Sequence, residues 1–299
     1  MGSLFSFKVC INHSCLNKRQ QIVQKKEIQE KEIMFSIKEL IDTIIQGDAL
    51  EVFELKNDDM KLEQNIIEAI QFLKDNEPSK GYLLGFSGGK DSQVVYELAK
   101  MSGVKFHAYF GLTSVDPPEV IKFVRDYYPE IEIKQPPITM WELIIKNGVP
   151  PTSMMRYCCR ALKEIYDGHI ITGIRASESA RRSKRDRIDY IKPNHIIYKP
   201  IFNWTENEVW EFHKKFNLPH CKLYDEGFTR IGCIGCPMKT PKQREADFIR
   251  WSNYYKAYIK AFDRMLVNRK KTAYLWHTGQ EVMDWWLKRK KSNQENNSC

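Results

Sequence analysis

The chain has 299 residues, of which 42% are hydrophobic, so it can form a core and is not a disordered chain. No apolar run approaches the roughly 20 residues that a membrane-spanning helix needs, so we expect no membrane partner. The net charge of +9 favours an anionic ligand such as a nucleotide or a nucleic acid, although ordinary solubility charge explains it equally well.

The first 33 residues are charged and prone to form a helix, and we interpret them as an extension that is disordered or not native, with Met34 as an alternative start. The N-terminus lacks the hydrophobic core and cleavage site of a signal peptide, so we expect a cytoplasmic protein with reduced cysteines. Its first residues, MGSLFS, also fit a short myristoylation pattern. Residues 34–78 are predicted to be a helical segment, because apolar residues recur at helical spacing in 36–46 and 60–75.

Residues 79–240 alternate between predicted strands and helices. Strands are expected at 81–86, 104–110, 131–134, 169–174 and 196–202, and helices at 92–101, 116–128, 139–146, from about 158, and at 204–217. Gly103 is expected to end the first of these helices, Asp116 is a candidate N-cap, and Thr205 with Glu208 forms a predicted capping box. This order predicts an α/β fold in which helices cover both faces of a parallel sheet. Residues 241–290 are predicted to be a helical, basic and aromatic segment, followed by a polar tail at 291–299.

The sequence SGGKDS follows the first strand of this domain and precedes a helix. Ligands of parallel α/β folds bind at the carboxyl ends of the strands, and the N–H groups of a helix N-terminus attract phosphate. Two glycines permit a tight turn, the lysine adds a charge, and the serines can donate hydrogen bonds. The segment is not a Walker A loop, because an aspartate stands where Ser or Thr would hold Mg²⁺. We expect these residues to bind phosphate, rather than to form a plain turn: Ser87, Gly88, Gly89, Lys90, Asp91 and Ser92.

Four of the eight cysteines form two close pairs. Cys158 and Cys159 are adjacent, and Cys233 and Cys236 form a C-x-x-C sequence whose glycines supply a turn. Four thiolates can complete the ligand shell of zinc or of an iron–sulfur cluster. Adjacent cysteines are unusual as zinc ligands because neighbouring side chains diverge, yet a structural zinc site and unrelated buried thiols both remain open. Cys221 is expected to pack in the core.

The basic segment GIRASESARRSKRDR follows a buried strand, so it lies at the same edge of the predicted sheet. Arg175, Arg181 and Arg182 can form bidentate hydrogen bonds with phosphate or sulfate oxygens. Glu178 can orient an arginine or bind a ribose hydroxyl. The outer basic residues fit a solvated loop as well as a phosphate site: Lys184, Arg185 and Arg187.

The SGGKDS loop resembles the pyrophosphate-binding loop (PP-loop) of the adenine-nucleotide α-hydrolase superfamily, whose members bind ATP or an adenylyl-sulfate nucleotide. Over residues 80–240, the segments VDPPE, RYCCRALKE, TGIRASESARR, KPIFNWTENEVWEFHKKFNLP and LYDEGFTRIGCIGCP are similar in order and spacing to the phosphoadenosine phosphosulfate (PAPS) reductase family. The paired cysteines resemble the iron–sulfur branch, the adenylyl-sulfate (APS) reductases. The resemblance implies that the four paired cysteines hold a [4Fe–4S] cluster. It also implies that Lys163 lies near the cluster and the substrate, and that Asp116 lies at the nucleotide site.

The chain departs from this family in one motif. The reductases attack the substrate sulfur with a cysteine in a Glu-Cys-Gly-Leu/Ile-His sequence, which this chain lacks. The candidate nucleophile is therefore Cys299, the last residue, although nothing around it resembles the family signature.

Three functions follow from the resemblance. The first is an APS or PAPS reductase that releases sulfite to a thiol reductant such as thioredoxin, with Lys90, Lys163, Arg175 and Cys299 as catalytic residues. The second is an ATP-pyrophosphatase-type sulfurtransferase that modifies DNA or tRNA, with Mg²⁺ as a further cofactor. The missing motif and the basic, aromatic C-terminal segment favour it. The third is a non-enzymatic nucleotide or redox sensor. We place the reductase first.

Overall fold

A computed structural model describes residues 57–163, 167–268 and 275–288. The extension at 1–33, Met34, the helix expected at 36–46 and Cys299 lie outside the described residues. Within them, no helix is long and apolar enough to cross a bilayer.

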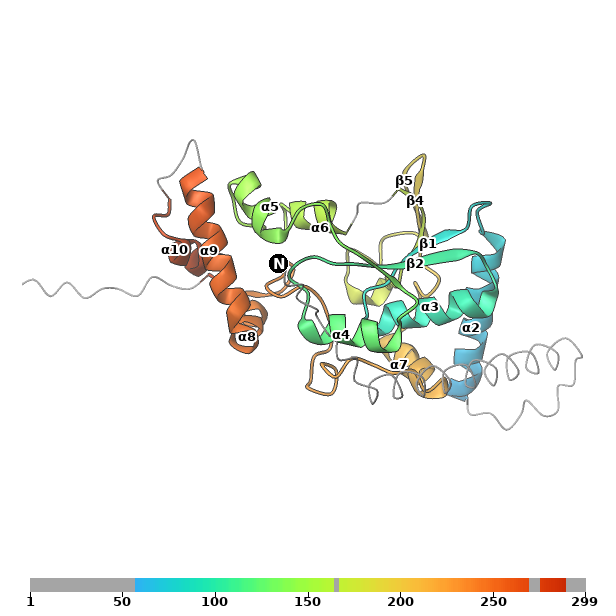
Figure 1. The fold of residues 1–299 in the computed structure, drawn as a ribbon. Helices are drawn as coiled ribbons and strands as arrows, with labels where there is room; N and C mark the ends of the chain where they lie inside the picture. The colour runs from blue at the N-terminus through green and yellow to red at the C-terminus, as the bar shows by residue number, and fades with distance from the viewer. Residues whose placement is uncertain (1–56, 164–166, 269–274, 289–299) are drawn as a thin grey trace, which may run out of the picture.

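A six-stranded sheet in the order β3-β2-β1-β4-β6-β5 forms the centre of the fold (Figure 1). Its strands are β1 (Tyr82–Gly85), β2 (Phe106–Gly111), β3 (Glu132–Lys134), β4 (Gly168–Ile171), β5 (Ile188–Lys192) and β6 (His195–Tyr198). All neighbouring pairs are parallel except β5 with β6. The chain moves from β1 to β2 and β3 on one side and later to β4 on the other. The topological switch point, where such folds bind ligands, therefore lies between β1 and β4.

Helices cover this sheet and extend beyond it. They are α2 (Asn57–Asp75), α3 (Lys90–Ser102), α4 (Pro118–Tyr127), α5 (Met140–Asn147), α6 (Tyr157–Leu162), α7 (Glu206–Lys215), α8 (Pro241–Arg250), α9 (Ser252–Asn268) and α10 (Gly279–Trp286), with a 3₁₀ helix at Ala176–Glu178. In Figure 1, α3, α4 and α7 lie below the strands, and α5 and α6 lie above them. The fold is thus the predicted α/β class with a mostly parallel sheet.

Two predicted helix boundaries differ from the structure. Helix α3 begins at Lys90, two residues earlier than expected, with Gly89 as its N-cap. Asp116 does not cap α4, which begins at Pro118 after the N-cap Pro117. Its carboxylate instead accepts a hydrogen bond from the backbone N–H of Thr113, 2.6 Å away, which closes the turn after β2. Pro117, which is the N-cap instead, offers no side chain that could bind the helix N–H groups.

Two other boundaries agree with the sequence. Gly103 ends α3 in the left-handed conformation with φ of 70°. The Thr205 hydroxyl accepts from the Glu208 N–H, and the Glu208 carboxylate accepts from the Thr205 N–H, which completes the predicted capping box.

The antiparallel edge strand β5 was not predicted. It pairs with β6 across Pro193 and Asn194, and its residues Tyr190 and Ile191 are 75% and 51% exposed. The turn-forming Pro-Asn between two stretches rich in isoleucine and tyrosine was the available hairpin signal. The predicted parallel α/β sheet is confirmed, and β5 adds one antiparallel edge strand to it.

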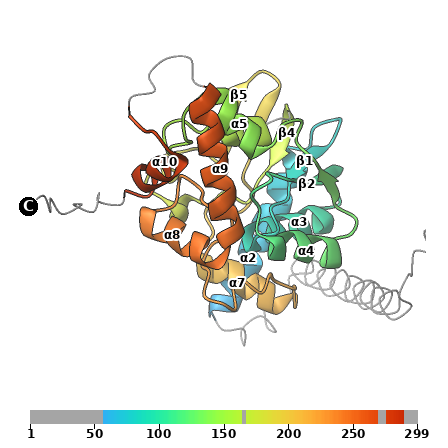
Figure 2. The ribbon, with the colours of Figure 1, turned by 60° about the vertical axis from the view of Figure 1, so that its left-hand side comes forward.

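The C-terminal helices share one hydrophobic core with the sheet domain. Figure 2 shows α9 crossing the face of the molecule between α5 and α8, with α10 beside it. Tyr258, Phe262 and Trp286 are almost fully buried, and the Trp286 indole donates to the carbonyl of Pro151, 2.7 Å away. These helices therefore belong to the packing that holds the preceding loops in place.

Candidate functional site

The PP-loop turns sharply at the carboxyl end of β1. Gly88 has φ of 71°, and a Cβ atom there would lie 3.0 Å from methyl groups of Val120 and Val124 on α4. The Ser92 hydroxyl donates to the Gly89 carbonyl at 2.8 Å and accepts from the Ser87 N–H at 3.2 Å. The two serines thus brace the loop itself. Its N–H groups at the start of α3 supply the partial positive charge that suits an anion.

The Lys90 side chain is buried beside the loop, with 3% of its surface exposed. Its ammonium donates to the carbonyl of Thr229 at 2.9 Å and lies 3.2 Å from the carboxylate of Glu206. The ring of Tyr224 lies beneath it, and the Tyr224 hydroxyl accepts from the Lys90 N–H at 2.9 Å. Lys90 therefore ties the loop to the segment that precedes the C-x-x-C turn.

A second ion pair ties the loop to the end of β4. The Arg175 guanidinium, 4% exposed, donates from Nε to Asp91 Oδ1 at 2.6 Å and from Nη1 to Ser177 Oγ at 3.0 Å. The two backbones also touch, because a Cβ at Gly173 would lie 2.8 Å from the carbonyl of Asp91. Arg175 and Asp91 therefore fix the two sides of the switch point relative to each other.

The remaining basic residues of segment 173–187 fall into two groups. Arg182 pairs with Glu178, whose carboxylate also accepts from the Arg175 N–H at 3.0 Å. Arg185 pairs with Asp189, and Arg187 pairs with Glu68. Arg181 and Lys184 are exposed.

His213 on α7 supports the loop from below. Its Nε2 lies 3.0 Å from the Lys90 carbonyl, which can only accept, so the neutral ring donates from this atom. Its Nδ1 is buried and has no hydrogen-bond partner among the residues that the structure describes. Burial lowers the pKa of His213 from its ordinary value of 6.5, because protonation would bury an unpaired charge.

This shift predicts a loss of stability in acid. The unfolded chain binds a proton near pH 6.5 that the folded chain resists, so the free energy of unfolding falls as pH drops below that value. We expect His213→Gln, which can still donate to the Lys90 carbonyl, to lose less stability between about pH 7 and pH 5. Urea unfolding across this range measures the effect. The control is His220→Gln, and equal pH profiles for the two variants would refute the assignment.

The four paired cysteines come together beyond the loop. Cys158 lies in the first turn of α6. Its thiol hydrogen bonds with Cys159, and this bond, burial and the charges of Cys159 and Cys233 raise the pKa of Cys158. Burial, then the charge of Cys233, raises the pKa of Cys236. Gly235 forms the C-x-x-C turn with φ of 68°, and its N–H donates to Asp247 on α8 at 2.9 Å. Elements far apart in sequence therefore bring these four cysteines together, and we call them the four-cysteine site.

Lys163 lies between the four-cysteine site and the turn after β2. The charge of Cys233 is the largest cause that raises the pKa of Lys163, and the carboxylate of Asp116 raises it further. The hydroxyl of Thr113, in the same turn, lies 3.5 Å from Cys233 Sγ. This cation thus stands where the cysteines meet the carboxyl edge of the sheet.

The four-cysteine site is the candidate metal site of the chain, and its donors are all sulfur. In the described part of the chain, no three His, Cys, Asp or Glu side chains are spaced to hold a single ion. A structural zinc site would need four ligand atoms within about 2.3 Å of one centre. A [4Fe–4S] cluster takes an all-thiolate donor set, which the four cysteines can offer.

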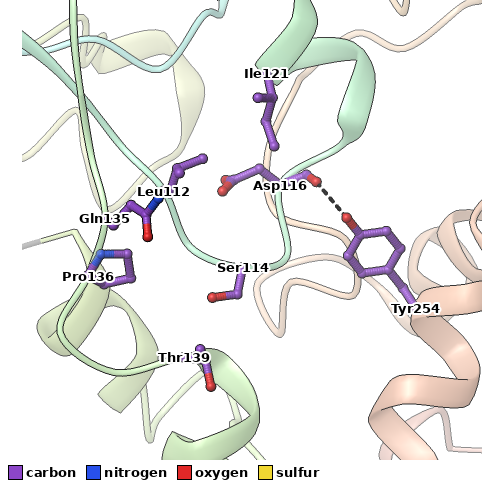
Figure 3. A pocket seen from close by; sticks show the side chains of 8 residues that line it. All are labelled: Leu112, Ser114, Asp116, Ile121, Gln135, Pro136, Thr139 and Tyr254. Atoms are coloured by element: carbon purple, nitrogen blue, oxygen red, sulfur yellow. Dashed lines mark hydrogen bonds between the residues drawn. The ribbon is translucent and has the colours of Figure 1, made fainter. Parts of the chain in front are cut away.

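A hollow of about 250 Å³ opens beside Asp116 (Figure 3). The Tyr254 hydroxyl on α9 donates to the Asp116 carbonyl at 3.2 Å and closes one side. The lining combines apolar with hydroxyl, amide and carboxylate groups: Leu112, Ser114, Asp116, Ile121, Gln135, Pro136, Thr139 and Tyr254. The hollow lies at the ends of β2 and β3, next to the strand that carries the PP-loop. It can hold a small, partly polar group.

Sequence reasoning missed the aromatic supports of this site. Tyr224 lies under Lys90 and Tyr254 beside Asp116, and neither was singled out from the sequence. Tyr258 donates to the Ile234 carbonyl inside the C-x-x-C segment. The available signal was the number of tyrosines in the segments next to the cysteines.

A glycine-rich loop at the switch point of a mostly parallel α/β sheet is typical of nucleotide-binding α/β folds. A model of the phosphoadenosine phosphosulfate reductase domain matches residues 81–239, more than half of the chain. The chain therefore belongs to the phosphoadenosine phosphosulfate reductase family, which confirms the resemblance seen in the motifs.

Similar proteins carry related descriptions. A protein of Methanocaldococcus jannaschii described as uncharacterized is 31% identical over 219 residues, which cover 64% of this chain and 45% of that protein. An adenosine 5'-phosphosulfate reductase of Staphylococcus haemolyticus is 30% identical over 154 residues, which cover 46% of this chain and 61% of the reductase. The match thus spans about half the length of the first relative. A solved phosphoadenylyl-sulfate reductase of Candida auris superimposes with a TM-score of 0.42 and 16% identity, covering 60% of this chain and 96% of the other.

Proposed function

We propose that this protein is a sulfonucleotide reductase, which takes APS or PAPS and releases sulfite. The family match over residues 81–239 carries the proposal, and Lys163, whose pKa is raised by Cys233 and by Asp116, supports it. Its ammonium interacts with Cys233 on one side and with Asp116, which lines the hollow of Figure 3, on the other. A sulfate bound beside Lys163 would lie next to both this cation and the cysteines.

The substrate would lie along the carboxyl edge of the sheet. The N–H groups at the start of α3 would bind the phosphosulfate oxygens, as helix N-termini bind anions. The hollow beside Asp116, with its apolar walls and hydroxyl and amide groups, would hold the nucleoside. Arg175 and Lys90, which are engaged within the protein, would keep the loop in its binding shape.

Cys158, Cys159, Cys233 and Cys236 would hold a [4Fe–4S] cluster. When bound, this cluster supplies charge and redox tuning next to the substrate. Lys163 would offset the negative charge of the thiolates and attract the sulfate.

The reaction needs a nucleophilic thiolate and a thiol reductant. The thiolate attacks the substrate sulfur, an S–S bond forms, the S–O bond to phosphate breaks, and the nucleoside phosphate leaves with the electron pair. A thiol of a thioredoxin-like reductant then attacks the cysteine sulfur, forms a mixed disulfide and expels sulfite. Cys299 is the proposed nucleophile.

A second candidate keeps the fold but uses ATP. Cys221 is fully buried, and burial raises the pKa of its thiol, so it is not a reactive nucleophile. Besides Cys221 and the four-cysteine site, the sequence holds Cys10, Cys15 and Cys299, and we take Cys299 as the nucleophile of the reductase reaction. If Cys299 has no chemical part, the alternative is an adenylating sulfurtransferase that cleaves ATP to pyrophosphate and modifies DNA or tRNA.

One experiment separates the two candidates. Anaerobically purified protein is incubated with APS, PAPS or ATP plus Mg²⁺ and a dithiol, and sulfite and pyrophosphate are both measured. We expect sulfite from APS or PAPS, and its loss in Cys299→Ser. Sulfite that persists in Cys299→Ser would exclude Cys299 as the nucleophile. Pyrophosphate from ATP without sulfite would overturn the reductase in favour of the sulfurtransferase.

A further inference from the structure

A second hollow, of about 470 Å³, lies beside the C-x-x-C turn. Its walls come from residues 237–241, which directly follow Cys236, from residues 152–153 before α6, and from Trp285 and Lys288 at the end of α10. It shares no lining residue with the hollow of Figure 3 or with the PP-loop. The site proposed for the sulfonucleotide does not account for it.

The wall of this hollow contains a buried arginine. Arg244 is 5% exposed, and its Nε has no hydrogen-bond partner within the part of the chain that the structure describes. The guanidinium lies 4.8 Å from the centre of the Trp286 ring. A buried, incompletely paired guanidinium is costly, and an anion in the hollow would offset that cost. Cys236 also attracts this cation, and the variants below leave that attraction in place.

An aromatic surface and a second cation border the same hollow. Trp285 is 48% exposed, and the centre of its ring lies 4.9 Å from that of Trp276. Lys288 is exposed, whereas Lys239 is already paired with Asp247. The anion that fits should therefore carry a flat apolar group, because a sulfate or phosphate alone would leave Trp285 unused.

The C-terminal part of the sequence is also rich in positive charge. Residues 241–299 contain 13 Lys and Arg but 6 Asp and Glu, so they hold seven of the nine net positive charges. The sequence continues after Lys288 as Arg-Lys-Lys. Such an excess suits a polyanion that runs past the hollow rather than a single small ligand.

We propose that this hollow binds a nucleotide unit of a single-stranded nucleic acid, with the base on Trp285 and phosphates at Arg244 and Lys288. Aromatic stacking together with cationic phosphate contacts is how proteins bind single strands without sequence preference. A strand bound here would pass beside the C-x-x-C turn. The binding requires no turnover, so it stands or falls independently of the reductase chemistry.

Fluorescence anisotropy tests the proposal on the full chain. The probes are fluorescein-labelled single-stranded DNA and RNA of about 12 nucleotides, a length within the usual site sizes. We expect binding that weakens steeply with salt. Trp285→Ala should reduce the affinity about tenfold, and Lys288→Ala should lower the salt dependence by about one phosphate contact.

Lys80→Ala is the matched control, because this exposed lysine precedes β1 at the opposite end of the strands. Circular dichroism confirms that each variant is folded. Three outcomes would overturn the proposal: no binding at about 50 mM salt, equal affinity of all three variants, or equal competition by an acidic peptide of matched charge. The last result would mean binding to any polyanion without base stacking.

Discussion

Arg175→Met is expected to lower the free energy of unfolding by about 3 kcal/mol, because it leaves one partner of a buried ion pair alone. The guanidinium of Arg175 is 4% exposed and holds Asp91 at 2.6 Å, and the side chain of Asp91 is one-quarter exposed. Methionine fills much of the same volume, so the loss reports the charge rather than a cavity. Urea unfolding at neutral pH measures it.

The matched control is Arg182→Met on the neighbouring pair with Glu178. That pair is more exposed and lies on the surface loop, so the expected loss is below about 1 kcal/mol. The double variant Arg175→Met with Asp91→Asn should recover part of the stability, because the unpaired carboxylate is gone. Equal losses for the two arginines would show that the Arg175 pair does not fix the switch point.

Gly235→Ala is expected to disrupt the C-x-x-C turn. Alanine at φ of 68° costs about 1–2 kcal/mol, and its Cβ would lie 2.7 Å from Cζ of Phe248, which adds about 1–3 kcal/mol of overpacking. Phe248 is held between Tyr258 and Trp286, so it cannot move aside freely. The free energy of unfolding, measured in urea, should fall. The amount of iron bound after anaerobic reconstitution should fall as well.

Gly148→Ala separates strain from overlap. This glycine has φ of 65° at the end of α5, and nothing lies within 4 Å of the added Cβ. The free energy of unfolding that Gly148→Ala loses should therefore equal the conformational strain alone, and iron binding should be unchanged. If Gly235→Ala lowered the free energy of unfolding no more than Gly148→Ala does, the contact with Phe248 would not hold the turn.

Local patterns in the sequence were sufficient for the class of fold. Alternating strands and helices predicted the α/β sheet, and the capping box at Thr205 and the glycine at 103 marked helix ends correctly. The errors were also local: Asp116 was read as a cap, and the hairpin of β5 was missed. The first error arose because Pro117 is the N-cap of α4, and the second because the Pro193-Asn194 turn was not read as a hairpin signal.

The sequence by itself determined the PP-loop, the two cysteine pairs and the family, because each depends on residue types at short, fixed spacing. Only the tertiary structure decided what these residues contact. It turned Lys90 toward Thr229, joined Arg175 to Asp91, and set Lys163 between Cys233 and Asp116. It also packed α8–α10 against the cysteine turn, so Arg244 and Trp285 came to border one hollow. Contacts between residues far apart in the chain depend on how the core packs, which spacing along a single sequence does not reveal.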